Sequence, residues 1–329
     1  MYNLPYPPMV ELARLRTPLV PMERLSDEVG APLLCKRDDL TGAALSGNKV
    51  RKLEFLLSDA LSRGCDRVIT CGGEQSNHAR ATALAAARMG LSCHLLLRTS
   101  DPAAPPTGLE GNLLLDRLAG ATIRWISPDD YARRDALMEE EAQRLGGSVY
   151  VVPEGGSNGL GAWGYVRCAE ELATDVGPVE ATVIYAVGSG GTAAGLIAGC
   201  KLLDLPYRLI GVCVCDDRAT FQARISAILA EMADAYGVAV EIAPEEIEIW
   251  EDYVGRGYAL SREEELASIC HVTRLEGLVT DPVYSGKALH GLLSELRGGA
   301  VLSDPIIFLH TGGIFGLFPK AEQLRPLLD

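Results

Sequence analysis

Three short polar stretches of this chain have residue types that could bind and react with a small molecule. Lys49 stands at the expected start of a helix, directly after Gly47 and Asn48. Residues 72–78 form a polar turn ahead of an alanine-rich segment, and residues 188–192 contain only glycine, serine and threonine. A lysine amine is a nucleophile for aldehydes, and consecutive backbone amides in a glycine-rich turn can bind a phosphate. The combination predicts a site for pyridoxal 5'-phosphate.

Lys49 begins a segment, residues 49–62, whose apolar side chains recur at helical spacing. In the first turn of a helix the macrodipole disfavours a cation, so the amine should shift towards its neutral, nucleophilic form. An ordinary solvated lysine is the alternative. Lys52, one turn further on, is either a surface charge or a source of positive potential near the phosphate. The residues expected to face a core are Val50, Leu53, Leu56, Leu57, Ala60 and Leu61.

The second stretch predicts the capped start of a helix over residues 77–89, with Ser76 or Asn77 as the cap. Free amides at a helix start suit a carboxylate. Taken alone, this pattern is no more than a cap. Beside Lys49, it could fix the carboxylate of an amino acid, and Asn77 could bond to the phenolic oxygen of the cofactor.

Residues 188–192 also fit a dinucleotide fingerprint, with a strand before them, a helix after them and Asp216 at the end of the next strand. A nicotinamide-dependent oxidoreductase is therefore a rival interpretation. It would leave Lys49 and Ser76 without a role, whereas the amides of residues 189–192 suit a single phosphate. The three stretches together favour pyridoxal phosphate.

Short apolar segments alternate with helical patterns along the whole chain, which predicts an α/β fold with parallel or mixed sheets covered by helices. The expected strands are residues 33–36, 67–71, 93–97, 122–125, 149–152, 182–187, 209–215 and 306–310. The expected helices include residues 49–62, 77–89, 109–118, 133–145, 191–203 and 219–236.

Composition limits the class of partner. With 329 residues, 48% of them apolar, the chain can bury one or two cores. A net charge of −14 disfavours nucleic acid and anionic membranes, so a small molecule is the expected partner. No apolar run is long enough to span a bilayer and residues 1–11 lack signal-peptide features, so a cytoplasmic protein is expected. The nine scattered cysteines predict reduced thiols, and no metal site is predicted.

In combination, several motifs resemble those of the fold type II, or tryptophan-synthase-like, pyridoxal-phosphate enzymes. Within them the chain is similar to the group of D-cysteine desulfhydrase and 1-aminocyclopropane-1-carboxylate deaminase. The resemblance runs from about Pro18 to Phe318. The motifs that carry it are residues 36–42, 47–49, 51–54, 75–77, 188–192, 275–277, 280–284 and 310–313.

The resemblance implies a homodimer of two-domain subunits, with residues 53–158 as the smaller domain, residues 1–52 and 159–329 as the larger cofactor domain, and the site in the cleft between them. Lys49 would hold the cofactor as a Schiff base. The implied catalytic residues are Lys49, Ser76, Tyr284 and Tyr258. The implied cofactor ligands are Lys49, Lys52, Asn77, Gly188, Ser189, Gly190, Gly191, Thr192, Ser285 and Thr311. The implied substrate contacts are Ser76, Asn77, His78 and Tyr284.

Two positions separate branches of this group. The ring-opening deaminases usually have glutamate after the Tyr284 position and leucine at the Thr311 position, where this chain has Ser285 and Thr311. A neutral hydroxyl near the pyridine nitrogen makes the ring a weaker electron sink, which suffices when a good leaving group departs from Cβ. The expected reaction is β-elimination from D-cysteine, with Lys49 as the base, giving pyruvate, ammonia and hydrogen sulfide.

Other substrates and functions stay open at this stage. Ser46 replaces the usual glycine, Glu74 precedes Gln75, and residues 314–316 depart from the pattern of the group. L-cysteate, other β-substituted alanines, the cyclopropane acid and β-replacement are alternatives. A carrier or regulator that binds the cofactor without catalysis is a further alternative, although the intact site residues disfavour it.

Overall fold

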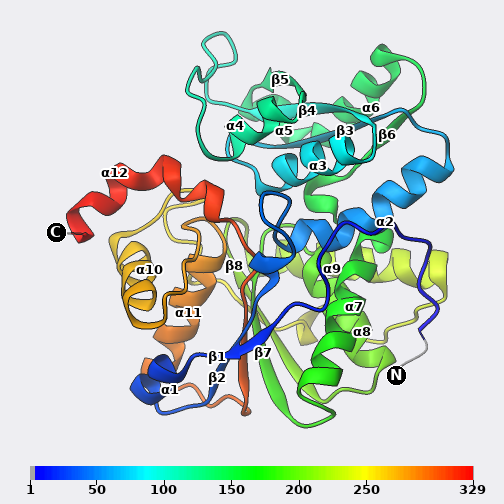
Figure 1. Ribbon diagram of the computed structural model, residues 1–329. Coiled ribbons are helices and arrows are strands. Elements are labelled where there is room, and N and C mark those ends of the chain that lie inside the picture. The colour runs from blue at the N-terminus through cyan, green and yellow to red at the C-terminus, as the bar shows by residue number, and fades with distance from the viewer. Residues whose placement is uncertain (1–3, 329) are drawn as a thin grey trace.

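The computed structural model describes residues 4–328, which build two sheets with helices packed around each (Figure 1). The larger sheet has six strands in the order β1-β2-β10-β7-β8-β9, and only the β1–β2 pair is antiparallel. Its strands are β1 (Leu19–Pro21), β2 (Leu33–Lys36), β7 (Ala181–Val187), β8 (Tyr207–Cys213), β9 (Ile249–Trp250) and β10 (Ile306–Leu309). The α/β prediction with parallel and mixed sheets is confirmed.

The smaller sheet is wholly parallel, in the order β5-β4-β3-β6. Its strands are β3 (Arg67–Gly73), β4 (Ser92–Arg98), β5 (Thr122–Ile126) and β6 (Val149–Val151). The helices of this part of the chain are α3 (Asn77–Arg88), α4 (Gly111–Leu118), α5 (Pro128–Ala132) and α6 (Arg134–Leu145). This sheet falls inside the range predicted for the smaller domain, and the boundaries at residues 53 and 158 stay a prediction.

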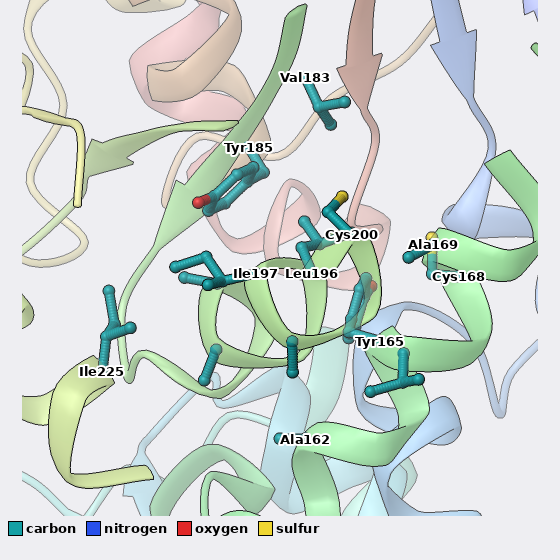
Figure 2. Close-up of a cluster of buried hydrophobic side chains, with 14 of the residues drawn as sticks. Ala162, Tyr165, Cys168, Ala169, Val183, Tyr185, Leu196, Ile197, Cys200 and Ile225 are labelled. Atoms are coloured by element: carbon teal, nitrogen blue, oxygen red, sulfur yellow. The ribbon is translucent and has the colours of Figure 1, made fainter. Parts of the chain in front are cut away.

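Strand β7 shows how the larger sheet is covered on both faces. Val183 and Tyr185 belong to the core shared with α7 (Gly159–Asp175), α8 (Gly191–Leu202) and α9 (Arg218–Tyr236), as Figure 2 shows, and Val187 belongs to the same core. The alternate residues Ile184 and Ala186 belong to a second core, shared with α11 (Ser285–Arg297). Successive side chains of a strand point to opposite faces, so a continuous apolar run indicates a doubly covered strand. The helices are α1 (Glu23–Val29), α7 (Gly159–Asp175), α8 (Gly191–Leu202), α9 (Arg218–Tyr236), α10 (Glu263–Glu276), α11 (Ser285–Arg297) and α12 (Ala321–Leu324).

Helix α2 (Asn48–Ser62) lies between the two sheets (Figure 1). It packs tightly on α7, where a Cβ added to Gly164 would lie 2.5 Å from the backbone carbonyl carbon of Arg51. Most of the predicted apolar stripe is buried, but Leu61 is 36% exposed and does not face the core. Because polar residues such as Arg51 and Lys52 are buried as well, α2 is enclosed on most of its surface rather than along one stripe.

Strands β3 and β8 differ from the predicted ranges by two residues, and the other predicted strand ends agree within one residue. Strand β3 continues through Gly72 and Gly73, because both pair with β4 and neither carries a side chain that would clash with its neighbours. Strand β8 is shifted towards the N-terminus and ends at Cys213, so Cys215 lies beyond the strand and not on a shared strand face with Cys213. All nine cysteines lie in the described part of the chain and are unpaired, seven of them buried. Within residues 4–328, no helix is long and apolar enough to cross a membrane.

Candidate active site

A cavity of about 380 Å³ lies at the carboxyl ends of strands from both sheets. Its lining includes Gly72 near the end of β3, Arg98 at the end of β4 and Val187 at the end of β7. In α/β proteins such crevices are the usual ligand sites. The predicted site residues that line the cavity are Lys49, Ser76, Asn77, His78, Gly188, Ser189, Gly190, Thr192, Tyr258, Tyr284 and Thr311.

Three predicted residues do not line the cavity. Lys52 and Gly191 lie directly behind its wall, where the Lys52 ammonium donates to Ser157 Oγ at 2.9 Å and the Gly191 amide donates to the same atom at 3.3 Å. The buried hydroxyl of Ser285 donates to the carboxylate of Asp281 at 2.6 Å. Of the predicted hydroxyl pair, only Thr311 borders the cavity.

Lys49 is positioned by the tight turn that precedes it. Gly47 has a φ of 91°, and a Cβ at this position would lie 2.9 Å from the Thr311 carbonyl oxygen. Both the backbone conformation and the close contact therefore require glycine. The Lys49 ammonium donates to the Gly155 carbonyl at 3.2 Å. Burial lowers the pKa of Lys49 to about 8. The sequence predicted a lowered pKa correctly, but it attributed the shift to the helix dipole, whereas burial is the main cause in the structure.

Lys52 is 1% exposed, so its interpretation as a surface charge is wrong. Burial, together with the charge of nearby Lys49, holds its pKa well below the ordinary value. Its amine donates to Ser157 and lies 3.3 Å from the Gly155 carbonyl oxygen. Within residues 4–328 no carboxylate pairs with it, so a bound anion would supply the missing counter-charge.

The turn at residues 188–192 has the geometry of a phosphate cradle. Gly190 has a φ of 90° and is the N-cap residue of α8, where it has no side chain that could cap the helix. A Cβ at Gly191 would lie 2.9 Å from the Lys52 amine, so only glycine leaves that approach open. Asn48 joins this turn to the start of α2 by donating to Thr192 Oγ1 at 3.3 Å. Free amides at a helix start with a lysine beside them fit the phosphate of pyridoxal phosphate.

The start of α3 forms a second wall of the cavity. Ser76 is the N-cap and accepts the Ala79 amide at 3.2 Å, so its capping role is real. Asn77 Oδ1 accepts a hydrogen bond from Asn112 at 3.0 Å. His78 Nε2 lies 2.8 Å from Thr70 Oγ1, and burial holds the pKa of His78 well below its usual range, so the ring is neutral.

Two tyrosines form the third wall. The hydroxyls of Tyr258 and Tyr284 lie 2.8 Å apart. Gly73 makes room for the first ring and Gly188 for the second, since added Cβ atoms would lie 3.3 Å and 3.0 Å from them. Burial raises the pKa of Tyr258 to about 12 and that of Tyr284 well above its ordinary value, so both phenols carry their protons at neutral pH.

The sequence analysis missed five charged or aromatic residues of the cavity: Arg98, Tyr131, Arg134, Glu154 and Arg224. Glu154 accepts from the Tyr131 hydroxyl and pairs with Arg134 at 2.9 Å. A signal existed in the sequence, because residues 153–158 form another glycine-containing polar turn directly after a strand. Arg98, Tyr131 and Arg134 gave no comparable signal, since each stands alone in an ordinary context.

A sequence model described as "Pyridoxal-phosphate dependent enzyme" matches residues 10–312. The chain belongs to this family. The match confirms the prediction of pyridoxal phosphate over a nicotinamide dinucleotide, and the role of residues 188–192 as its phosphate site stays a prediction. For the fold, a structure of a threonine deaminase isoform from Solanum lycopersicum superposes with a TM-score of 0.67 at 18% identity, covering 96% of this chain and 84% of that one. The predicted fold type is confirmed as well.

Relatives of higher sequence identity align with almost the whole chain of this enzyme. It is 42% identical to a D-cysteine desulfhydrase of Yersinia enterocolitica, over 96% of this chain and 97% of that protein. It is 40% identical to a mitochondrial bifunctional D-cysteine desulfhydrase/1-aminocyclopropane-1-carboxylate deaminase of Arabidopsis thaliana, over 96% of this chain and 81% of that protein. The crystal structure of a homologue of 1-aminocyclopropane-1-carboxylate deaminase superposes with a TM-score of 0.88 at 39% identity, covering 98% of this chain and 96% of that one.

The lowered pKa of Lys49 predicts how the cofactor-free enzyme should capture pyridoxal phosphate. The neutral amine is the nucleophile, so the rate should rise as pH increases and the amine loses its proton, then level off above the pKa of about 8. Between pH 7 and pH 9 we expect an increase of about tenfold. Stopped-flow absorbance checks this. A rate that keeps rising to pH 10.5 would show an ordinary lysine instead.

Proposed function

We propose that this enzyme is a lyase that catalyses β-elimination on a small amino acid, most simply D-cysteine, giving pyruvate, ammonia and hydrogen sulfide. The observation that carries the proposal is a buried lysine of lowered pKa in a cavity that is also bordered by a neutral hydroxyl, Thr311. Among the described residues, the two carboxylates that line this cavity, Glu154 and Asp216, are each paired with an arginine. The D-cysteine desulfhydrase of Yersinia enterocolitica, 42% identical, supports the choice of substrate.

The residues of the cavity divide the work of holding the cofactor. Lys49 would bind the aldehyde of the cofactor. Residues 188–192 and Lys52 would bind its phosphate, and Asn77 would bind its phenolic oxygen. Thr311 would meet the pyridine nitrogen. When bound, pyridoxal phosphate supplies an electron sink for the bonds of the substrate's Cα.

The start of α3 would bind the substrate's α-carboxylate. The amides of Asn77 and His78 belong to its first turn and have no intrahelical acceptor, so they are available to an anion. The freed amine of Lys49 then removes the Cα proton, which its lowered pKa makes efficient near neutral pH. Tyr284 or Tyr258 would donate a hydrogen bond to the departing thiolate, because both phenols keep their protons.

The surroundings of Thr311 support elimination over ring opening. Asp281, whose carboxylate lies beside Gly313, is already occupied, since it accepts the amides of Val283, Tyr284 and Ser285 as well as the Ser285 hydroxyl. A carboxylate would favour a protonated, strongly electron-withdrawing ring, whereas a hydroxyl does not. The weaker sink suits a substrate with a good leaving group on Cβ.

A panel of candidate substrates tests the proposal. Wild-type enzyme is assayed for 2-oxo acid and ammonia release from D-cysteine, L-cysteate, D-serine and 1-aminocyclopropane-1-carboxylate, with sulfide measured separately. The highest kcat/KM should belong to D-cysteine. A preference for the cyclopropane acid would support the deaminase named among the relatives, and a preference for L-cysteate another lyase. No turnover in an enzyme with bound cofactor would support a carrier.

Lys287 gives a further prediction, because it positions the loop that carries Tyr258. Its buried ammonium donates to the carbonyls of Val254 at 2.6 Å, Gly257 at 2.8 Å and Leu260 at 3.2 Å. Lys287→Met should lower kcat/KM about 10- to 100-fold by displacing that loop. Steady-state kinetics with the best substrate of the panel check this, with the exposed Lys201→Met as control. Unchanged kinetics in Lys287→Met would contradict a positioning role.

A further inference from the structure

Arg98 is a cation of the active-site cavity that the proposed reaction does not use. It is the last residue of β4, where it pairs in register with Gly73 of β3, so it lies at the same sheet edge as the start of α3. Its guanidinium carbon lies 4.8 Å from the centre of the Tyr131 ring and 5.5 Å from that of Tyr258. Contacts with two aromatic rings hold the planar group in place without using its N–H donors.

Charge pairing in the cavity leaves Arg98 without a partner among the described residues. Of the three arginines that line it, Arg134 pairs with Glu154 at 2.9 Å and Arg224 pairs with Asp216 at 2.8 Å. Over residues 4–328, Arg98 has no ion pair and its side chain has no hydrogen bond. A half-buried guanidinium with unused donors and no counter-charge is suited to bind an anion from outside the chain.

The α-carboxylate of the substrate does not require Arg98, because the start of α3 already offers free amides for it. Arg98 stands on the neighbouring strand, near the tyrosines expected to face the departing group. An anion at Arg98 would therefore be a second acidic group of the same substrate.

We propose that Arg98 recognises an acidic group attached to the substrate's Cβ, so that the enzyme also takes amino acids with an anionic β-substituent. The conversion of such a substrate rests on the proposed β-elimination, whereas its binding at Arg98 does not. For serine O-sulfate the step is balanced as follows. The Cα proton goes to Lys49, the Cβ–O bond breaks with its electron pair leaving as sulfate, and water converts the remainder to pyruvate and ammonium.

Binding can be tested without turnover. Calorimetry on the holoenzyme compares 3-sulfopropanoate with propanoate, which lack the amine and differ by one sulfonate. Wild type should bind the sulfonate compound about 10- to 100-fold more tightly, the range of charge-assisted hydrogen bonds. Arg98→Met should lose this preference, Arg98→Lys should keep part of it, and the exposed Arg117→Met of α4 should keep it all. Equal binding by wild type, or an undiminished preference in Arg98→Met, overturns the proposal.

Turnover separates this proposal from the proposed function. Arg98→Met should lower kcat/KM for serine O-sulfate about 10- to 100-fold more than for β-chloroalanine, whose leaving group is uncharged in the substrate. An equal loss on both substrates would place Arg98 at the α-carboxylate or in packing and overturn the proposal. If wild type eliminates from neither substrate in either enantiomer yet prefers the sulfonate compound in binding, the anion site stands and β-elimination fails. Absorbance of the bound cofactor and Tm confirm that Arg98→Met is folded.

Discussion

Lys49→Ala should remove the visible absorption band of the bound cofactor and reduce turnover by at least about 10³-fold. The lysine is expected to act twice, as the group that binds the aldehyde and as the base at Cα. Its amine borders the cavity beside the Gly155 carbonyl, and burial lowers its pKa to about 8. Absorbance spectra and pyruvate release measure the two losses independently.

Lys201→Ala is the matched control, because this lysine is exposed at the end of α8 and lies outside the cavity. It should keep both the absorption band and the activity. A folded Lys49→Ala variant that retained the band and turned over substrate would show that another residue holds the cofactor. Lys52 would then be the first candidate, since its amine contacts the same carbonyl.

Arg51→Met should lower the free energy of unfolding by about 3–5 kcal/mol, the cost of breaking a buried ion pair by removing one partner. Arg51 is fully buried and binds Asp38 at 2.7 Å and Glu171 at 2.8 Å. Without it, Asp38 keeps a buried charge whose remaining contacts are hydroxyls such as that of Tyr165. Arg51 and Lys49 both lie near the start of α2. The loss of stability in Arg51→Met should therefore also lower the affinity for the cofactor. Urea unfolding of the holoenzyme measures the loss.

Arg325→Met is the control for this experiment. Arg325 pairs with Glu322 at 2.6 Å, but the two side chains are 69% and 78% exposed, so its loss should leave the free energy of unfolding almost unchanged. Equal effects of the two substitutions would mean that the Arg51 cluster is hydrated and contributes little. Replacing Arg51, Asp38 and Glu171 together by apolar residues should recover part of the stability, because no charge is then left unpaired.

Local patterns predicted the elements of this fold well. The continuous apolar run of β7 indicated a strand covered on both faces, and its alternate residues indeed reach two different cores. The helix that begins at Asn48 and the cap at Ser76 follow from spacing and capping chemistry within a few residues. The end of β3 was placed two residues early, because a glycine pair commonly marks a turn. Here Gly72 and Gly73 serve instead as the close-packed end of a strand.

Lys52 shows where such patterns fail. From its position on α2, the Lys52 side chain could be exposed to solvent or buried beside the cavity. It is buried because residues 155–157 and 188–192 pack against that turn of the helix. Ser285 shows the same limit, since its neighbour in sequence, Tyr284, borders the cavity while its own hydroxyl turns to Asp281.

The sequence by itself determined the local features from which the site is proposed: a lysine at a helix start, a capped helix start and a glycine-rich turn. Each depends on contacts between residues close in the chain, which local composition encodes. The tertiary structure decided which charges share the cavity, including Arg98, which has no ion pair within residues 4–328, and Glu154, which pairs with Arg134. Those residues come from separate strands and loops, so their proximity depends on how the two sheets are arranged and not on any local pattern.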